Sequence, residues 1–309
     1  MKRNLERLPI SGYPPYLDDS RRLAFVIPIF RLSRASQWVK SSIAVATSLV
    51  ANTNVIQNRI PIYFLVENDV YENHWQDFMT ANISQNRILT FNPFNSDILI
   101  NRVSLKLMAL MQSALDQYDC YCIIDADLFA CCNPELQQQI DVTLLEGDRL
   151  GCLWFEKEVK DKQEMIETSL RYCKYGRDWT MDKADIADFE QSEAALRSVY
   201  PNFSMKMDRL YDNLKAGIIR LPNPLPHRFK EFCLKLESKL GDDELILLLY
   251  TTFFGGETET FEGHHVKVAY RPEKMMQIRE TAPYWAHLWN EDLDVQDWEK
   301  THWLDAGLI

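Results

Sequence analysis

Hydrophobic and polar positions along the chain fall into blocks that predict strands and helices in alternation. Short apolar runs predict buried strands, and they lie at Leu23–Phe30, Ile60–Val66, Arg87–Phe91, Tyr121–Ile124, Leu214–Leu221 and Val266–Tyr270. Apolar residues spaced three and four apart predict helices, and these segments are Ser36–Leu49, Tyr71–Ala81, Val103–Leu115, Arg228–Leu240 and Leu245–Phe254. Strands that alternate with helices favour a mostly parallel sheet with right-handed crossovers.

Three stretches depart from this alternation. Residues 1–20 hold three prolines and show no clear period, which predicts an irregular lead-in. Pro28 stands inside the first apolar run and has no N–H to donate, so we expect that strand to end early or to bulge. Residues 156–212 are rich in charge and lack a strand-like run, which predicts a helical insertion beside the sheet.

These patterns predict an α/β fold of one domain. No shift in composition marks a boundary, so we expect residues 1–309 to form a single unit. Its centre should be a mixed, mostly parallel sheet flanked by helices. The lead-in and the insertion would be appended to that sheet.

Composition and charge narrow the kinds of function that are open. Hydrophobic residues make up 46% of the chain, enough for a packed core, and the net charge of −11 argues against a nucleic-acid binder. The seven cysteines follow no zinc-binding spacing, which favours reduced thiols in a cytoplasmic protein. No apolar run approaches the roughly 18 residues of a membrane span, and the charged start leads into no signal-like segment. We therefore expect no transmembrane segment, while peripheral membrane contact stays open.

The clearest chemical signal is Asp125-Ala126-Asp127, which directly follows an apolar run. On an extended backbone, side chains two residues apart point to the same side, so the carboxylates would form one anionic site. Ligands of open α/β sheets bind beyond the carboxyl ends of strands. Mg²⁺ or Mn²⁺ would bind there through carboxylates and substrate phosphates. The alternative is that the two acids only terminate a strand at the surface.

A diphosphate would depend on such a metal, because the chain lacks the usual phosphate loop. The segment after the first strand, Arg31-Leu-Ser-Arg34, has no glycine-rich pattern. A bound cation and side chains would have to hold the phosphates instead.

Four segments, in the same order along the chain, resemble the core of GT-A-fold glycosyltransferases. The resemblance is closest to glycosyltransferase family 8, the retaining group that includes glycogenin and the bacterial lipooligosaccharide galactosyltransferases. The segments are the helix with Lys106 followed by the strand ending in Asp125-Ala-Asp127, then Lys215-Ala-Gly217, Gly241-Asp242-Asp243 and Trp285-Ala-His287-Leu-Trp289.

The chain departs from the family pattern at several positions. Lys215 and Asp243 replace the family's Asn and Gln, and Asn290-Glu-Asp stands where the family has Gly-x-x-Lys-Pro-Trp. The opening Ile27-Pro28-Ile29-Phe30 also resembles a motif of inverting glycosyltransferases, without its Asn. Retention and inversion both stay open at this point.

The resemblance implies a metal site and a donor site. Asp127 would bind the metal directly, and Asp125 would contact the metal or the ribose of the donor. His287 would be the third metal ligand, or else a packed core histidine. Lys106 and Arg102, which are four residues apart, would reach a phosphate or lie as solvated cations.

Three further residues are candidates near the sugar. Asp242 and Asp243 are the candidate catalytic residues, which would bind sugar hydroxyls or supply a general base, or else cap a helix. Gly217 would permit close approach of the donor, or relieve packing at a bend.

The sequence thus predicts a glycosyltransferase that depends on Mn²⁺ or Mg²⁺. The expected donor is a nucleoside-diphosphate sugar, a UDP-sugar by resemblance, and the acceptor a hydroxyl of a carbohydrate, glycolipid or protein. Retention of configuration is expected. The alternatives are an inverting GT-A enzyme, a Mg²⁺-dependent nucleotidyltransferase or phosphatase-like hydrolase, and a catalytically silent GT-A-like binding protein.

Overall fold

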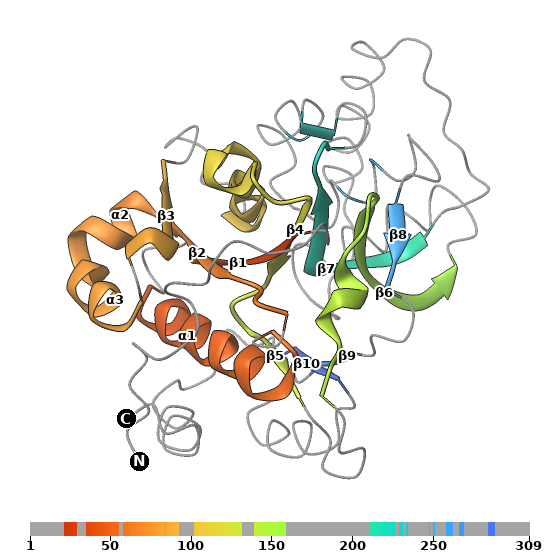
Figure 1. Cartoon of the computed structure of the whole chain (residues 1–309), viewed down its shortest axis with the longest axis horizontal. Coiled ribbons are helices and arrows are strands. Elements are labelled where there is room, and N and C mark those ends of the chain that lie inside the picture. Colours follow the sequence, from red (N-terminus) through yellow and green to blue (C-terminus); the bar gives the residue numbers. More distant parts are fainter. Residues whose placement is uncertain are drawn as a thin grey trace, which may run out of the picture.

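The core of the protein is a seven-stranded sheet in the order β3-β2-β1-β4-β7-β6-β8 (Figure 1). The computed structural model describes residues 22–29, 35–55, 58–83, 85–92, 102–131, 139–158, 211–225, 229–230, 233, 247, 250, 258–261, 266–268 and 284–287. The strands of this sheet are β1 Leu23–Ile29, β2 Ile62–Glu67, β3 Ile88–Phe91, β4 Cys120–Ile124, β6 Leu150–Glu158, β7 Tyr211–Pro222 and β8 Thr258–Thr260. A second, three-stranded sheet has the order β5-β10-β9, with β5 Leu128–Ala130, β9 Val266–Val268 and β10 Trp285–His287.

The strand directions confirm the predicted mixed, mostly parallel α/β sheet. Strand β1 pairs in parallel with both β2 and β4, and β2 pairs in parallel with β3. Strand β7 runs antiparallel to β4 and β6 on its two sides, and β6 pairs in parallel with β8. The carboxyl ends of β1, β2, β3 and β4 therefore meet at one edge of the sheet, where ligands of such folds bind.

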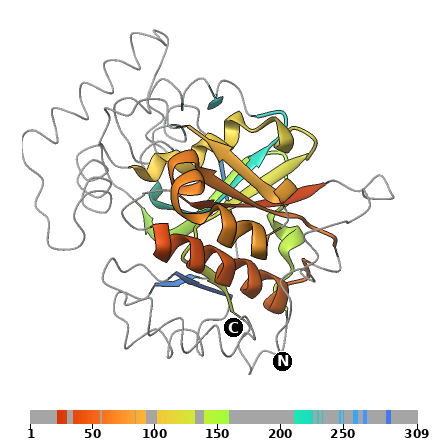
Figure 2. The same cartoon turned by 90° about the vertical axis from the view of Figure 1, so that its left-hand side faces the viewer.

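Helices cover both faces of this sheet. Helix α1 (Ala35–Asn52) and helix α3 (Gln76–Asn82) lie on one side, and the 3₁₀ helix η5 (Arg102–Met111) lies on the other (Figures 1 and 2). All seven residues of β1 are buried, as expected for a strand covered on both faces. The remaining helical segments are α2 Asn68–Val70, η3 Tyr71–Trp75, η4 Gln85–Arg87, η6 Ser113–Leu115 and η7 Val142–Leu145.

Strand β1 continues through Pro28, so the predicted early end or bulge is wrong. The N–H of Phe25 donates to the carbonyl of Pro61, just before β2, at 2.9 Å. Because successive N–H positions alternate sides along a strand, position 28 faces β4. The pairing of β1 with β4 has already ended at Val26, opposite Ile123. The proline therefore removes no hydrogen bond from the sheet.

The ends of the predicted insertion at 156–212 are strand. Glu158 at the end of β6 lies opposite Tyr211 at the start of β7, so the antiparallel pairing of the two strands extends into this range. Residues 159–210 and the lead-in at 1–20 lie outside the described residues. The single-domain organisation stays a prediction.

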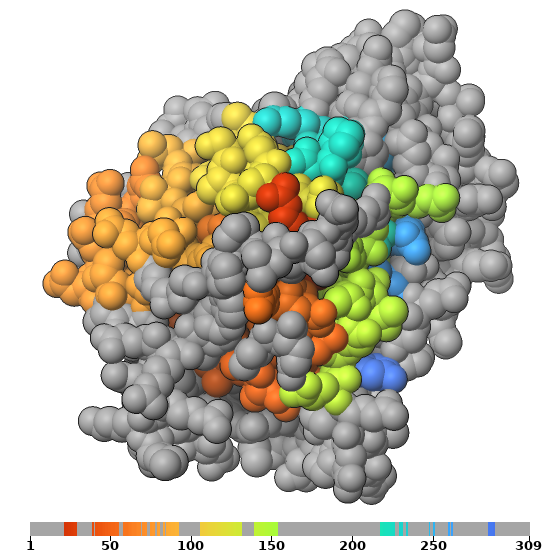
Figure 3. Space-filling view, viewed as in Figure 1, coloured from red at the N-terminus to blue at the C-terminus, as the bar shows by residue number. Residues whose placement is uncertain are grey.

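The turn after β7 is hydrogen-bonded to the segment before β4, at the end of the sheet opposite the carboxyl ends of β1 to β4. The N–H of Asn223, just after β7, donates to the carbonyl of Asp119 at 2.7 Å. Its side-chain amide donates to the carbonyl of Asp116 at 2.8 Å. In Figure 3 these two segments, coloured cyan and yellow, lie side by side on the face toward the viewer.

The described helices and cysteines bear on the expectations about membrane and thiols. None of the described helices is long and apolar enough to cross a membrane. The cysteines that the structure describes are buried thiols: Cys120, Cys122, Cys131, Cys152 and Cys233.

A buried arginine joins three segments at the amino end of β6. Arg220 in β7 is 2% exposed, and its guanidinium donates to the carbonyls of Arg149 at 3.0 Å and Glu146 at 3.3 Å. It also pairs with Glu259 of β8 at 2.5 Å. A Cβ on Gly151 would lie 3.0 Å from Nε of Arg220 and 2.7 Å from the ring of Phe261.

Two glycines on neighbouring strands are expected to respond oppositely to replacement by alanine. Gly151→Ala should lower the free energy of unfolding by about 1–3 kcal/mol, because its methyl group would overlap Arg220 and Phe261. At Gly217 the nearest atoms to an added Cβ are 3.4 Å away, so Gly217→Ala should be neutral or stabilise by up to about 1 kcal/mol. Urea unfolding of the two variants measures both effects. Equal losses would contradict this account of the packing.

Candidate metal centre

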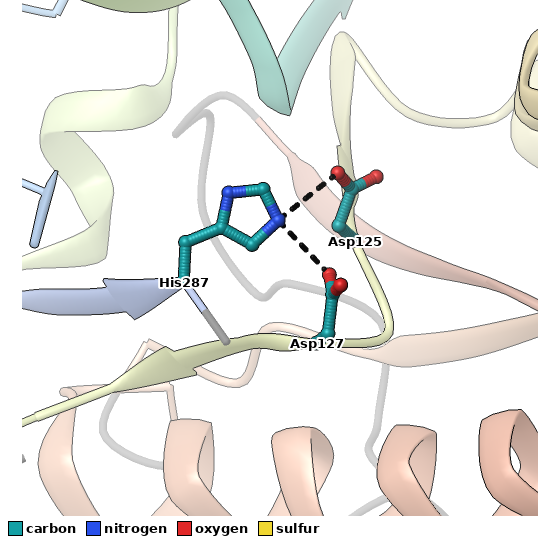
Figure 4. Close-up of side chains that lie close together, drawn as sticks. All are labelled: Asp125, Asp127 and His287. Carbon is teal, nitrogen blue, oxygen red and sulfur yellow. Dashed lines mark hydrogen bonds and ion pairs between the residues drawn. The ribbon is translucent and has the colours of Figure 1, made fainter. Parts of the chain in front are cut away.

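Two carboxylates and one imidazole meet at the carboxyl edge of the main sheet. Asp125 directly follows β4, and Asp127 lies two residues further on. His287 is the last residue of β10, which pairs antiparallel with β5 so that His287 lies opposite Leu128. The pairing of these two short strands brings the histidine to the acids across 160 positions of sequence (Figure 4).

The spacing of the three side chains fits one divalent cation. One ligand atom from each of the three residues can be chosen so that all lie within 4.8 Å of one another. Nε2 of His287 lies 3.1 Å from Oδ1 of Asp127 and 3.9 Å from Oδ2 of Asp125. Adjacent ligands around an octahedral ion with bonds of about 2.1 Å are roughly 3 Å apart. Small movements of these side chains would therefore let all three contact the same ion.

The donor set also narrows the choice of metal. Carboxylate oxygens are the usual ligands of Mg²⁺ and Mn²⁺, whereas imidazole suits first-row transition metals. The three side chains are only 13–20% exposed, which limits but does not close access to solvent. This combination suits a divalent cation such as Mn²⁺ or Mg²⁺.

The backbone of the acidic segment forms a β-turn. The N–H of Leu128 donates to the carbonyl of Asp125 at 3.0 Å, which makes Ala126 and Asp127 the central residues of the turn. The N–H of Asp125 donates to the carbonyl of Gly217 in β7 at 2.9 Å. The predicted extended backbone is therefore wrong at this point. The strand ends at Ile124, and the turn brings the two carboxylates to the same side (Figure 4).

Lys106 belongs to this cluster. Its ammonium lies 2.8 Å from Oδ1 of Asp125, and its side chain is 2% exposed. The alternative of a solvated surface lysine is wrong. Helix η5, which carries Lys106, packs against β1 and buries the residues around it. Contact between Lys106 and a donor phosphate stays a prediction.

Opposing effects act on the pKa of Asp125. Burial raises the pKa of this carboxyl above its usual value, and the neighbouring charge of Asp127 raises it further. The ammonium of Lys106 and the imidazole of His287 act to lower the same pKa. The ionised form of Asp125 is thus incompletely compensated within the protein. A divalent cation at this position would supply the missing positive charge.

Of the other predicted site residues, the structure describes Gly217 and the backbone of Arg102. Gly217 lies beside the cluster, since a Cβ there would be 3.9 Å from Nδ1 of His287. The backbone of Arg102 begins helix η5, in the same helix as Lys106. Asp242 and Asp243, the predicted catalytic pair, lie outside the described residues.

Sequence reasoning missed three polar side chains of α1 that contact the backbone of the acidic turn or of the strand β5 that follows it. The hydroxyl of Ser41 donates to the carbonyl of Ala126 at 2.5 Å. The hydroxyl of Ser48 accepts from the N–H of Ala130 at 3.0 Å, and the amide of Asn52 donates to the carbonyl of Ala130 at 2.9 Å. The sequence signal that could have found them is their spacing: Ser41, Ser48 and Asn52 are seven and four positions apart, so they lie on one face of a largely buried helix.

The fold and the site together define an α/β protein with a carboxylate–histidine centre at the ligand-binding edge of its sheet. No family model matches the chain, and the search of curated proteins finds no match to it.

Several solved structures that resemble the chain distantly are of glycosyltransferases. The mannosyltransferase Ktr4p from S. cerevisiae is 12% identical, over 84% of this chain and 76% of that one, with a TM-score of 0.46. Core-mannan synthase A from Aspergillus fumigatus, in a Mn/GDP form, is 8% identical over 82% and 75%, with a TM-score of 0.47. A glycosyltransferase involved in glycosylation of the major capsid of PBCV-1 is 7% identical over 92% and 99%, with a TM-score of 0.45. Likenesses at this distance carry no activity over to the chain.

Proposed function

We propose that the protein is a metal-dependent glycosyltransferase of the GT-A type that uses a nucleoside-diphosphate sugar. The observation that carries this proposal is the convergence of Asp125, Asp127 and His287 at the carboxyl edge of a mostly parallel sheet. Those three residues would hold the ion. Bound there, it would provide Lewis-acid stabilisation of the charge that develops on a departing diphosphate.

The charges of the cluster explain why donor binding should require the metal. Asp125 and Asp127 bring two negative charges and Lys106 brings one positive charge, so the site is net negative when His287 is neutral. A diphosphate would be repelled by this arrangement. A divalent cation reverses the sign of the site and makes it complementary to the donor.

Lys106 would keep Asp125 ionised and correctly placed. Its ammonium is already bound to one carboxylate oxygen of Asp125, which leaves the other oxygen, Oδ2, turned toward His287. A buried lysine in this position holds the carboxylate in one orientation before any ligand arrives. Such preorganisation reduces the reorganisation needed during the reaction.

The finer assignment follows the resemblance to glycosyltransferase family 8. We infer a UDP-sugar donor, Mn²⁺ as the metal, retention of configuration and a hydroxyl of a carbohydrate, glycolipid or protein as acceptor. Asp242 and Asp243 are proposed to contact the donor sugar or the acceptor. We further propose that the enzyme acts in the cytoplasm.

Metal-dependent stabilisation by nucleotides tests this function. We expect UDP or a UDP-sugar to raise the unfolding temperature with Mn²⁺ but not with EDTA, because only the metal-loaded site attracts a diphosphate. At 100 times the dissociation constant, a ligand stabilises by about 2.7 kcal/mol. The panel should include UDP-glucose, UDP-galactose, UDP-N-acetylglucosamine and GDP-mannose, together with an assay for released nucleoside diphosphate.

The same panel separates the alternatives. Stabilisation and release with GDP-mannose alone would replace the UDP assignment and keep the reaction class. Turnover of a nucleoside triphosphate with release of pyrophosphate or phosphate would instead favour the nucleotidyltransferase or hydrolase alternative. If no nucleotide stabilises the protein with any divalent metal, the proposed function is wrong.

A further inference from the structure

The hydroxyl of Ser41 contacts the peptide that joins Ala126 to Asp127. Ser41 lies in α1 and donates to the carbonyl oxygen of Ala126 at 2.5 Å. Ala126 is itself buried, at 4% exposed. The contact therefore reaches the stretch of backbone between the two acidic residues of the candidate metal centre, without touching either carboxylate.

The hydrogen bond that closes a β-turn does not fix the orientation of the turn's central peptide, which here joins Ala126 to Asp127. The hydrogen bond from Leu128 to Asp125 closes the turn but involves only its outer groups. The central peptide can rotate between type I and type II turns, which changes φ of the third residue from about −90° to about +80°. That third residue is Asp127. Its side-chain direction depends on which way the central peptide faces.

At its third residue, Asp127, the observed turn has the negative φ of a type I turn. Among the described residues other than glycine, positive φ is found at Arg59, so φ of Asp127 is negative. Rotation of the central peptide would turn the carbonyl of Ala126 away from Ser41 and give Asp127 a positive φ, which L-residues adopt less readily. Only the observed orientation keeps both the hydrogen bond to Ser41 and the contact of Asp127 with His287.

Helix α1, which carries Ser41, also contacts strand β5. Ser48 and Asn52, on the same face of α1, bind the N–H and the carbonyl of Ala130. Val45, between Ser41 and Ser48 in the chain, is fully buried. Helix α1 thus contacts the chain at two places, the 125–128 turn through Ser41 and strand β5 through Ser48 and Asn52.

We propose that Ser41 is a positioning residue for the metal centre, holding the central peptide of the 125–128 turn so that Asp127 faces His287. This inference rests on the proposed metal site. Its physical basis is that a ligand whose backbone is fixed before binding needs no reordering when the ion arrives.

Mn²⁺ alone, titrated by electron paramagnetic resonance, provides the test in the full chain. We compare Ser41→Thr with Ser41→Val, which have nearly the same shape and differ in the hydroxyl. Ser41→Thr should bind Mn²⁺ as the wild type does. Ser41→Val should raise the dissociation constant roughly three- to tenfold, the equivalent of one hydrogen bond.

Ser48→Ala is the matched control, because it removes a contact of the same helix with Ala130, beyond the turn. It should lower thermal stability and leave the Mn²⁺ affinity unchanged. Equal affinities for Ser41→Val and Ser41→Thr would overturn the inference. So would an equal loss of affinity in Ser48→Ala, since the effect would then be a general loosening of α1. Failure of the wild type to bind Mn²⁺ would instead overturn the proposed metal site itself.

Discussion

Replacing Asp127 by asparagine is expected to reduce Mn²⁺ affinity by more than about 100-fold and to abolish sugar transfer. Loss of a residue that only supports a metal ligand already costs 10–100-fold in affinity, and Asp127 is proposed to be a ligand. Its carboxylate lies 3.1 Å from Nε2 of His287 and is 13% exposed. Calorimetric titration with MnCl₂ measures the affinity, and release of nucleoside diphosphate measures the activity.

The fold of this variant should be intact. Asparagine has nearly the same shape and can still form a hydrogen bond with His287, and the change removes one of two like charges in the cluster. The unfolding temperature of the metal-free variant should therefore equal or exceed that of the wild type. Asp148→Asn is the matched control, because it makes the same change at an exposed residue before β6, at the opposite edge of the sheet. Unchanged Mn²⁺ binding by Asp127→Asn would refute the proposed role.

Replacing Lys106 by methionine should lower the free energy of unfolding of the metal-free protein by about 3 kcal/mol. The change leaves the largely buried carboxylate of Asp125 without its ammonium partner, and breaking a buried pair on one side costs several kcal/mol. Mn²⁺ should restore more stability to this variant than to the wild type, because the ion supplies the lost positive charge. Urea unfolding with and without MnCl₂ measures both quantities.

The double variant Lys106→Met, Asp125→Asn separates this cause from a general loss of packing. Removing both charges leaves no buried carboxylate unpaired, so the double variant should be more stable than Lys106→Met alone. If the two variants are equally destabilised, the ion pair is not what Lys106 contributes, and its role in orienting Asp125 is contradicted.

Apolar runs in the sequence predicted the centre of the sheet well. Strands β1, β2, β3, β4, β7 and β9 and helix α1 lie within a few residues of their predicted positions. The short strands β5 and β10 could not be found in this way, since three residues carry no period. Their pairing depends on contacts between Leu128 and His287, far apart in the chain.

Local rules also failed where tertiary contacts decide the geometry. The acidic pair was expected on extended backbone, but the chain turns after Ile124 and is held by the carbonyl of Gly217 and the hydroxyl of Ser41. Pro28 was expected to interrupt β1, but its missing N–H faces the side where pairing has already ended. In both cases a neighbouring segment, which no window of sequence contains, determines the outcome.

The candidate site was predicted in part. Asp125, Asp127 and His287 were named from the sequence, and the structure brings them together. Lys106 was expected near phosphate and is found bound to Asp125. A sequence names the residue types suited to a metal, but it does not say which of them neutralise one another before the ligand binds.

A crystal of the protein soaked with MnCl₂ and UDP, measured at a wavelength where manganese scatters anomalously, would show directly whether Asp125, Asp127 and His287 bind a metal ion. We expect one anomalous peak within about 2.3 Å of a carboxylate oxygen of Asp127, with Asp125 and His287 in its coordination shell and diphosphate oxygens completing it. A map with no peak between these residues, or UDP bound elsewhere without metal, would contradict this expectation.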